Sequence, residues 1–366
     1  MWSLGALVTG CVIDLLVGDP HGFPHPVIGI GKLIAALERL LRRWFPSTKR
    51  GERLAGLVLW ILVCAVSTAV PALVLWGLRS VSPWLSLAAE SIMCWQILAA
   101  KSLKTESMKV YDALKRGSLE RARYAVSMIV GRDTDALDEA GVTRAAVETV
   151  AENTSDGVIA PLLFMAILGA PFGFFYKAVN TMDSMLGYTD PPYNDIGLVP
   201  ARADDVVNFI PARISALMLL LAGKVLNGIS GIRRGGGCRT GRGVSSVTCR
   251  GGGRMRTVAD AKKAPGTGGR YDIQNGWRIF LRDRYRHASP NSAQTESVCA
   301  GLLRVQLAGD AWYHGILHKK PLIGDPLRPI AYEDIPSVCR LMYAAAGCAL
   351  VIFGVIRLVI VLLAGI

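Results

Sequence analysis

Apolar runs separated by short polar segments dominate the pattern of this chain. A helix needs about 20 mainly apolar residues to cross a bilayer, and several of the runs approach or exceed that length. They are Trp2–Val17, Leu54–Leu78, Trp84–Ala100, Val158–Tyr176, Phe209–Leu226 and Leu341–Ile366. The pattern therefore predicts an all-α, polytopic integral membrane protein with about four to six membrane helices.

One central run is irregular. Proline and glycine interrupt Val158–Tyr176 at Pro161, Gly169, Pro171 and Gly173. These breaks predict either a kinked span or a re-entrant hairpin, because irregular backbone at membrane depth must be buried in protein or line a cavity. If this run and Phe209–Leu226 both crossed fully, the polar segment between them would lie outside the cell. We therefore favour a re-entrant central pair.

The charged flanks predict the orientation. A cluster of basic residues precedes the strongest span: Arg39, Arg42, Arg43, Lys49, Arg50 and Arg53. The positive-inside rule places this end in the cytoplasm. The preceding amphipathic stretch, from Ile30 onward, is typical of a helix lying on the membrane surface. We expect a multi-pass protein of the cell membrane, with its active site on the cytoplasmic side.

Composition divides the chain into four regions. They are a membrane-embedded core (1–226) with a cytoplasmic helical arm (101–157), a Gly/Arg-rich tract (227–273), a basic helical segment (274–340) and a C-terminal transmembrane helix (341–366). The net charge is +13, and residues 227–286 alone hold 14 Lys and Arg against three Asp. The tract has few large apolar residues, which predicts a disordered tether. A patch for anionic lipid or nucleic acid is the alternative, although no specific nucleic-acid partner is expected.

Eight cysteines are scattered without a CxxC pair, so neither a disulfide framework nor a zinc site is predicted. Chemistry is instead indicated by polar clusters around the interrupted helices. The first comprises Glu148, Glu152, Asn153, Thr154, Ser155 and Asp156. Such residues can simply cap a helix, but their hard oxygen atoms also suit Mg²⁺ or phosphate binding. We favour the functional interpretation because the cluster exceeds what a cap needs.

A second cluster follows a helical stripe: Lys177, Asn180, Thr181 and Ser184, with Asp183 beside them. Positions i, i+3, i+4 and i+7 share one helix face. A lysine there can neutralise phosphate, and Asp183 can hold a cation. The alternative is a polar edge of a helix at the membrane interface.

A third cluster contains Arg202, Asp204, Asp205, Asn208 and Arg213. Adjacent carboxylates repel each other unless a cation or an arginine lies between them. Either bound Mg²⁺ or an ion pair between Arg202 and Asp205 would relieve that repulsion, and we favour the metal.

The fourth cluster consists of Arg284, Arg286, His287, Ser289, Asn291 and Glu296. Its Ser-Pro pair predicts a helix start, where free N–H groups attract anions. A plain helix cap is an equal alternative. Near the first helix end, Asp14, Asp19, His21 and His25 are either ligands or turn residues.

Five motifs, in order, carry a resemblance to a known family. They are GDP…HPVIGIGKLI, AENTSDGVIAPLL, YKAVNTMDSMLGY, ARADDVVNFIPARISAL and RHASPNSAQTES. Together they closely resemble the cobalamin-biosynthesis membrane proteins CobD and CbiB, which are adenosylcobinamide-phosphate synthases. The resemblance covers nearly the whole chain. The Gly/Arg-rich tract departs from it, because in that family the helix after PAR leads almost directly to the Arg-rich helix.

The resemblance implies an amide ligase. It would join adenosylcobyric acid, a corrinoid, to (R)-1-aminopropan-2-yl phosphate or a related amino-alcohol phosphate, using ATP and Mg²⁺ and giving adenosylcobinamide phosphate. Besides these substrates and the lipid bilayer, other cobalamin-biosynthesis enzymes are conceivable partners.

The resemblance also suggests roles for the clustered residues. Asp156, Asp183, Asp204 and Asp205 would hold Mg²⁺. Lys177, Arg202 and Arg213 would stabilise phosphoryl charge, and Glu152 or His287 would take the ammonium proton. The expected substrate-binding residues are Asn153, Thr154, Ser155, Asn180, Thr181, Ser184, Asn208, Arg213, Arg286, Ser289 and Asn291.

Two other functions remain open. A transporter also places polar residues on broken membrane helices, but it usually shows a repeated half, and none is visible here. The chain resembles AmpE-type membrane regulators weakly, and these would be non-catalytic.

Overall fold

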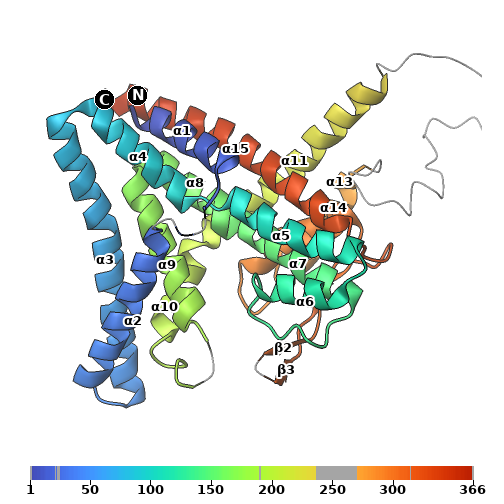
Figure 1. Cartoon of the computed structure of the whole chain (residues 1–366), viewed down its shortest axis with the longest axis horizontal. Helices are drawn as coiled ribbons and strands as arrows, with labels where there is room; N and C mark the ends of the chain where they lie inside the picture. Colours follow the sequence, from blue (N-terminus) through green and yellow to red (C-terminus); the bar gives the residue numbers. More distant parts are fainter. Residues whose placement is uncertain are drawn as a thin grey trace, which may run out of the picture.

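The computed structural model describes residues 2–20, 22, 25–188, 191–235, 270–313 and 315–364. Its helices are α1 (Trp2–Leu16), α2 (Pro26–Trp44), α3 (Lys49–Val81), α4 (Pro83–Ile97), α5 (Ala100–Lys115), α6 (Leu119–Ser127), α7 (Glu139–Asn153), η1 (Thr154–Ile159), α8 (Ala160–Leu168), α9 (Ala170–Leu186), α10 (Leu198–Val207), α11 (Phe209–Gly235), α13 (Ile273–Asp283), α14 (Ser292–Leu303) and α15 (Asp334–Ala364). Figure 1 shows α1 beside α4 and α15, with both chain ends together. The predicted helical fold class is confirmed for the described residues.

Three described helices are long and apolar enough to cross a membrane: Lys49–Val81, Phe209–Ser230 and Asp334–Leu363. The apolar part of α1 is shorter. We expected another span at 84–100, but α4 has only 15 residues and the chain turns into α5 at Ala100. The described chain thus contains three candidate spans, and the higher count that we expected is not confirmed.

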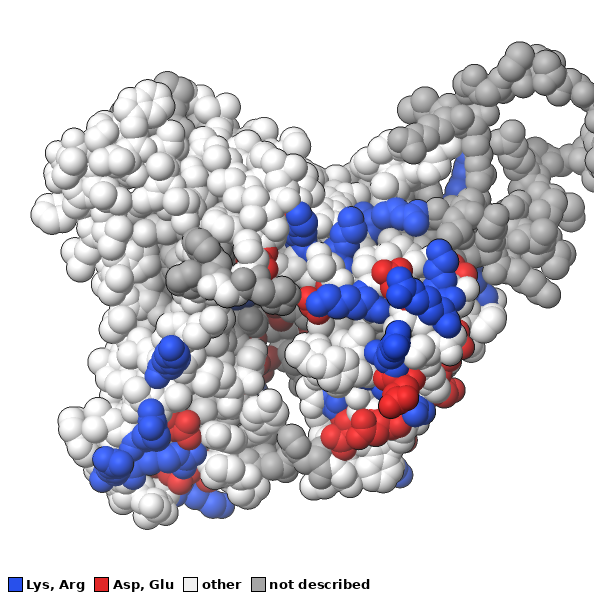
Figure 2. All heavy atoms as spheres, in the orientation of Figure 1, with Lys and Arg blue, Asp and Glu red and all other residues white. Residues whose placement is uncertain are grey.

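The faces of these long helices are suited to lipid. Only 28% of the most apolar window of α3 and 17% of that of α15 are buried inside the protein. In the view of Figure 2, the surface over α1, α4, the upper part of α3 and the end of α15 is almost free of charge, whereas charged side chains gather at the lower end of α3 and over the lobe at the right. Burial of such a face in hydrocarbon removes it from water, which is the behaviour of a membrane protein.

The interrupted run folds as two helices, α8 and α9, that pack against each other around Gly169. Gly169 has φ +87°, a left-handed conformation that favours glycine. Polar groups hold this turn: Arg357 donates to the Ile167 carbonyl at 2.9 Å, and Glu90 accepts a hydrogen bond from the Ala170 backbone. A single straight span through 158–176 is therefore excluded.

The molecule has two lobes in Figure 1. The first, at the left, contains α2, α3, α9 and α10, and the second, at the right, contains α5, α6, α7, α13 and α14. The segment that we predicted to be helical between 274 and 340 also holds two small antiparallel sheets, which pair β1 (Leu307–Ala308) with β4 (Leu322–Ile323) and β2 (Ala311–Tyr313) with β3 (Ile316–His318). Strands of two or three residues are too short for a periodic pattern in the sequence, so we missed them.

The boundaries of the Gly/Arg-rich tract also differ from our expectation. Helix α11 continues to Gly235, and the Asn227 side chain exchanges two hydrogen bonds with the Tyr271 backbone, at 2.8 and 3.0 Å. Both ends of the tract are therefore part of the fold. The remainder, 236–269, lies outside the described residues, and so does our prediction of a disordered tether there.

Candidate functional site

Acidic residues from three sequence motifs, carried by η1, α9 and α10, gather close enough for their charges to interact. Asp156 is carried by η1, a single π-helical turn between α7 and α8. Such turns are rare and are frequent at functional sites. Asp183 on α9 and Asp204 on α10 lie close enough for their charges to act on Asp156, as does Glu152 at the end of α7. The sequence clusters thus form one site.

Burial and mutual repulsion change the acidity of this group. Burial, followed by the charges of neighbouring carboxylates, raises the pKa of Asp183 to about 7. Burial likewise raises the pKa of Asp204 to about 6 and that of Asp156 well above its ordinary value. Carboxylates held together in this way are stabilised either by protons or by a cation.

The donor set therefore fits a hard cation such as Mg²⁺, although the protein does not provide a complete cage. Among the described residues, no three Asp, Glu, His or Cys side chains are arranged to hold a metal ion by themselves. Mg²⁺ usually takes one or two carboxylates and completes its shell with water and substrate phosphates. The metal assignment of Asp156, Asp183, Asp204 and Asp205 stays a prediction.

Hydrogen bonds orient Asp204. The Asn208 amide donates to both carboxylate oxygens of Asp204, each at 3.0 Å. The Tyr176 hydroxyl donates to Asn208 Oδ1 at 2.7 Å, which turns the amide nitrogen toward the carboxylate. Asn180 also bonds to Asp204. Asn208 and Asn180 therefore act here by positioning a carboxylate, a role that their spacing alone does not reveal.

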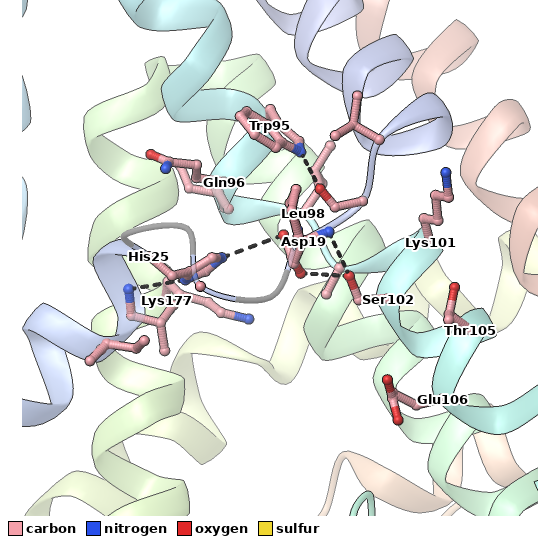
Figure 3. Close-up of a pocket in the computed structure, with 18 residues that line it drawn as sticks. Asp19, His25, Trp95, Gln96, Leu98, Lys101, Ser102, Thr105, Glu106 and Lys177 are labelled. Atoms are coloured by element: carbon pink, nitrogen blue, oxygen red, sulfur yellow. Dashed lines mark hydrogen bonds and ion pairs between the residues drawn. The ribbon is translucent and has the colours of Figure 1, made fainter. Parts of the chain in front are cut away.

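Lys177 on α9 connects the acidic group to a cavity of about 630 Å³ (Figure 3). Burial lowers the pKa of the Lys177 ammonium, although the negative charges of Asp156 and Asp19 act in the opposite direction. Lys177 forms no ion pair with any described residue, and Figure 3 shows its side chain extending into the cavity. A half-buried cation without a close partner is suited to bind an anionic group such as phosphate.

Residues of the GDP…HPVIGIGKLI motif also line this cavity. The Ser102 hydroxyl donates to Asp19 Oδ2 at 2.6 Å, and His25 Nε2 lies 3.6 Å from Asp19 Oδ1 (Figure 3). His25 Nδ1 accepts from the Val27 N–H at 3.3 Å, so a neutral ring carries its proton on Nε2, toward Asp19. Asp19 and His25 thus interact directly, whereas His21 lies outside the described residues.

The fourth cluster is attached to α10 and α11. The Ser289 hydroxyl donates to Asp205 at 3.1 Å, and the Asn291 amide donates to the Asp205 carbonyl at 2.9 Å. Arg213 donates to Asn291 Oδ1 at 3.1 Å and stacks 3.5 Å from the Phe209 ring centroid. Segments more than 70 residues apart in sequence are therefore joined next to the acidic group.

A smaller cavity of about 200 Å³ lies on the other side of Glu152. His287 lines it, and its Nδ1 accepts from the Ser289 N–H at 3.1 Å. Burial lowers the pKa of His287, which favours a neutral ring with its proton on Nε2. In that state His287 presents a donor to the cavity. Both bases that we considered, Glu152 and His287, thus line this cavity, and the choice between them stays a prediction.

Several side chains that we predicted to bind substrate form hydrogen bonds within the protein instead, most of them inside their own helix. The hydroxyls of Thr154, Thr181 and Ser184 donate to the carbonyls four residues earlier, at 2.7, 2.6 and 2.9 Å. The Asn153 amide does the same toward Thr149, although Asn153 also lines the smaller cavity. The Ser155 hydroxyl oxygen accepts from Ser215 at 3.2 Å. These bonds are typical of polar residues within helices.

Three predicted residues are exposed: Arg202, Arg286 and Ser184. Arg202 forms no ion pair among the described residues, so the pairing with Asp205 that we considered is not formed. Arg286 lies 3.4 Å from Asp283, one turn earlier on the same segment. The role of Arg202 in stabilising phosphoryl charge and the substrate-binding roles of Arg286 and Ser184 stay predictions.

The sequence analysis missed several residues of the site. Tyr176 was assigned only to the end of an apolar run, and Arg132, Tyr313 and Lys320 were not singled out, although all three line the smaller cavity. No local pattern marks them, because Arg132 follows a helix break and Lys320 follows a short strand.

Comparisons with known proteins show the family of the chain. The family model described as CobD/Cbib protein matches residues 7–342. The chain is 42% identical to the cobalamin biosynthesis protein CobD of Geobacter metallireducens, with 97% of each chain covered. The chain belongs to the CobD/CbiB family. CobD of Clostridium tetani is 39% identical over 95% of each chain, and CbiB of Salmonella typhi is 40% identical over 93% of each.

Membership of the CobD/CbiB family supports a role in cobalamin biosynthesis. The match spans both lobes and every motif described above, including Asp19 near its start and Glu296 toward its end. No solved structure matches the chain. The geometry of the two cavities and of the acidic group therefore comes from this chain's own structure.

Proposed function

We propose that the chain is an adenosylcobinamide-phosphate synthase. It would join adenosylcobyric acid to (R)-1-aminopropan-2-yl phosphate, or a related amino-alcohol phosphate, with cleavage of ATP. One observation carries this proposal. Two cavities are connected by a line of interacting charges, Lys177, Asp156 and Glu152, and each of these residues lies in or beside a family motif.

The chemistry requires activation of a carboxylate. A propionate oxygen of the corrinoid would bond to the γ-phosphorus of ATP and release ADP, giving an acyl phosphate. The amine nitrogen would then bond to the acyl carbon as inorganic phosphate leaves. Both steps need neutralised phosphate oxygens and an amine that has lost its proton.

The residues of the site suit these needs. Lys177 extends toward the larger cavity, where phosphate groups would lie. Asp156, Asp183, Asp204 and Asp205 would hold Mg²⁺, which would neutralise phosphate charge. Glu152 borders the smaller cavity and is the group that we assign to accept the ammonium proton.

The test is a reaction with purified full-length protein in detergent. Adenosylcobyric acid, 1-aminopropan-2-yl phosphate, ATP and Mg²⁺ are mixed, and adenosylcobinamide phosphate is measured by mass spectrometry. We expect product only when ATP and the amine are both present. A transporter or a non-catalytic regulator would give none, and absence of product from folded protein would overturn the proposal.

A further inference from the structure

The smaller cavity is a polar chamber in the second lobe. Its walls come from α7, α14, the segment before α7 and the β2–β3 hairpin. The charged residues that line it are Arg132, Glu148, Glu152, His287, Glu296 and Lys320. With a volume of about 200 Å³, it is smaller than the roughly 300–1,000 Å³ typical of pockets for drug-sized molecules. Its occupant must be small.

Two of the three glutamates in this chamber have partners. Glu148 forms an ion pair with Arg132 and accepts from the Ala308 N–H at 2.6 Å. Glu152 accepts a hydrogen bond from the Ser292 hydroxyl at 2.7 Å. Glu148 and Glu152 therefore already have hydrogen-bond or ion-pair partners within the protein.

Glu296 differs from them. Only 5% of this residue is exposed, and its Oε2 atom is buried without a hydrogen-bond partner among the described residues. A buried carboxyl oxygen without a hydrogen-bond partner is costly. Burial, followed by the charges of Glu148 and Glu152, raises the pKa of Glu296 well above its ordinary value, and the more weakly acting charges of Lys320 and Arg132 oppose this shift. Glu296 Oε2 therefore has room for a hydrogen bond from a cationic ligand, which would also favour its ionised form.

A basic group lies elsewhere on the same wall. Lys320 Nζ donates to the Tyr313 hydroxyl at 2.7 Å and lies 4.7 Å from the centroid of that ring. An ammonium has three donors, so the contact with Tyr313 leaves two for an anion. The chamber thus offers carboxylate oxygens for a cation and a lysine for an anion.

We propose that this chamber binds the small amino-alcohol phosphate, with its primary ammonium on Glu296 and Glu152 and its phosphate toward Lys320. This assignment rests on the proposed function and extends it by locating one substrate. The charge of Glu152 also acts on Asp156, so an amine held here would lie beside the carboxylates that are proposed to hold Mg²⁺.

Binding is tested without ATP or corrinoid. The purified full-length protein is titrated calorimetrically with 1-aminopropan-2-yl phosphate and with propan-2-yl phosphate, which differs only by lacking the amine. We expect the wild-type protein to bind the amine at least about ten-fold more tightly, the effect of one charge-assisted hydrogen bond. Glu296→Gln should remove this difference. The matched control, Glu120→Gln on the exposed face of α6, should preserve it.

A second variant covers the case in which Glu296→Gln does not fold. Lys320→Gln, on the chamber wall, should weaken binding of both phosphates by about ten-fold. Wild-type affinities in folded Glu296→Gln, or in Lys320→Gln, would overturn the assignment. If binding behaves as expected but no ligation occurs, the proposed function fails and the chamber assignment stands. If ligation occurs and folded Glu296→Gln keeps the wild-type KM for the amine, only the chamber assignment fails.

Discussion

The carboxylates of Asp156, Asp183 and Asp204 repel one another inside the protein, and neighbouring groups relieve this repulsion only partly. Asn208 donates two hydrogen bonds to Asp204, but the pKa of Asp204 remains raised, to about 6, because burial outweighs them. Lys177 interacts with Asp156 through its charge, but burial destabilises its ammonium form. The group is therefore poised to exchange protons for a bound cation near neutral pH.

This balance predicts a pH-dependent response to Mg²⁺. The pKa of Asp183 is about 7 in the folded protein, against an ordinary value of 3.8. The stability that the protonated form contributes is complete below that ordinary value and is lost as the pH rises through about 7. Mg²⁺ competes with those protons, so it should raise Tm more at about pH 8 than at about pH 5.5. Thermal unfolding in detergent measures both increments.

The control for this measurement is the double variant Asp183→Asn/Asp204→Asn, in which Mg²⁺ should raise Tm at neither pH. Equal increments in the wild-type protein at both pH values would contradict the expectation. They would show that Mg²⁺ does not bind in competition with these protons.

Catalysis should depend on the same two carboxylates. We expect Asp183→Asn and Asp204→Asn each to reduce product formation at least about 100-fold, because each removes a charge from the site that would hold the metal and its phosphates. Product formation is compared in membranes at equal protein level. The control is Asp135→Asn, an exposed carboxylate outside the site, which should retain activity. Normal turnover in Asp183→Asn would refute its assignment.

At the scale of single residues, the sequence was sufficient to predict which side chains belong to the site, but not which hydrogen bonds they form. Asp156, Asp183 and Asp204 were predicted to act together, and the structure brings them together because three helices converge. The hydroxyls of Thr181 and Ser184 lie on the predicted stripe, yet each bonds to its own helix. Helical spacing defines a face, but the competing backbone carbonyl four residues earlier decides where a hydroxyl points.

At the scale of elements, the loop between α9 and α10 determines how Asp183 and Asp204 meet. This loop packs against α3, where Arg53 forms an ion pair with the buried Asp195 at 2.9 Å. The contact is close because Gly56 has no side chain. A Cβ atom there would lie 2.1 Å from the Ile196 carbonyl oxygen. Helix α3 therefore supports the site as well as being a candidate span.

This contact predicts that Gly56→Ala destabilises the protein. The added methyl group forces the loop away from α3, at a cost of about 1–3 kcal/mol, and shifts α10 relative to α9. The matched control is Gly77→Ala on the same helix, where no atom lies within 4 Å of the new Cβ. That change should be neutral or stabilise by about 0.5–1 kcal/mol. Thermal unfolding and ligase activity, measured on both variants, should separate them; equal Tm values would contradict the packing argument.

Element boundaries show where sequence reasoning succeeds and where it stops. The break at Gly169 was predictable, because glycine and proline interrupt the run there and glycine readily adopts the left-handed conformation observed. The end of α4 at Ile97 was not, since the following residues remain apolar and only tertiary packing turns the chain. The β2–β3 hairpin, which carries Tyr313 to the smaller cavity, was likewise hidden by its length.

At the scale of the whole molecule, charge and apolar surface are segregated. The surface seen over α1, α4, the upper part of α3 and the end of α15 carries almost no charge, while basic residues surround the start of α3 (Figure 2). The apolar windows of α3 and α15 are mostly exposed. This segregation supports a membrane protein. It also leads us to expect that the basic end of α3 faces the cytoplasm, because cytoplasmic flanks are enriched in lysine and arginine.

That orientation can be measured by cysteine labelling. The loop after α9 is attached to the basic end of α3 through the ion pair of Arg53 with Asp195 at 2.9 Å. Arg42, near the end of α2, also donates to the Pro192 carbonyl of this loop at 2.8 Å, so the loop and the basic end of α3 should lie on the same side. In a background with the eight native cysteines replaced, Ser184→Cys and Tyr193→Cys should react with an impermeant maleimide in inverted vesicles but not in intact cells. Ser82→Cys, at the opposite end of α3, should react in intact cells. Labelling of Ser184→Cys from outside would place the acidic group away from cytoplasmic ATP, and the proposed ligase reaction could not then proceed in the cell.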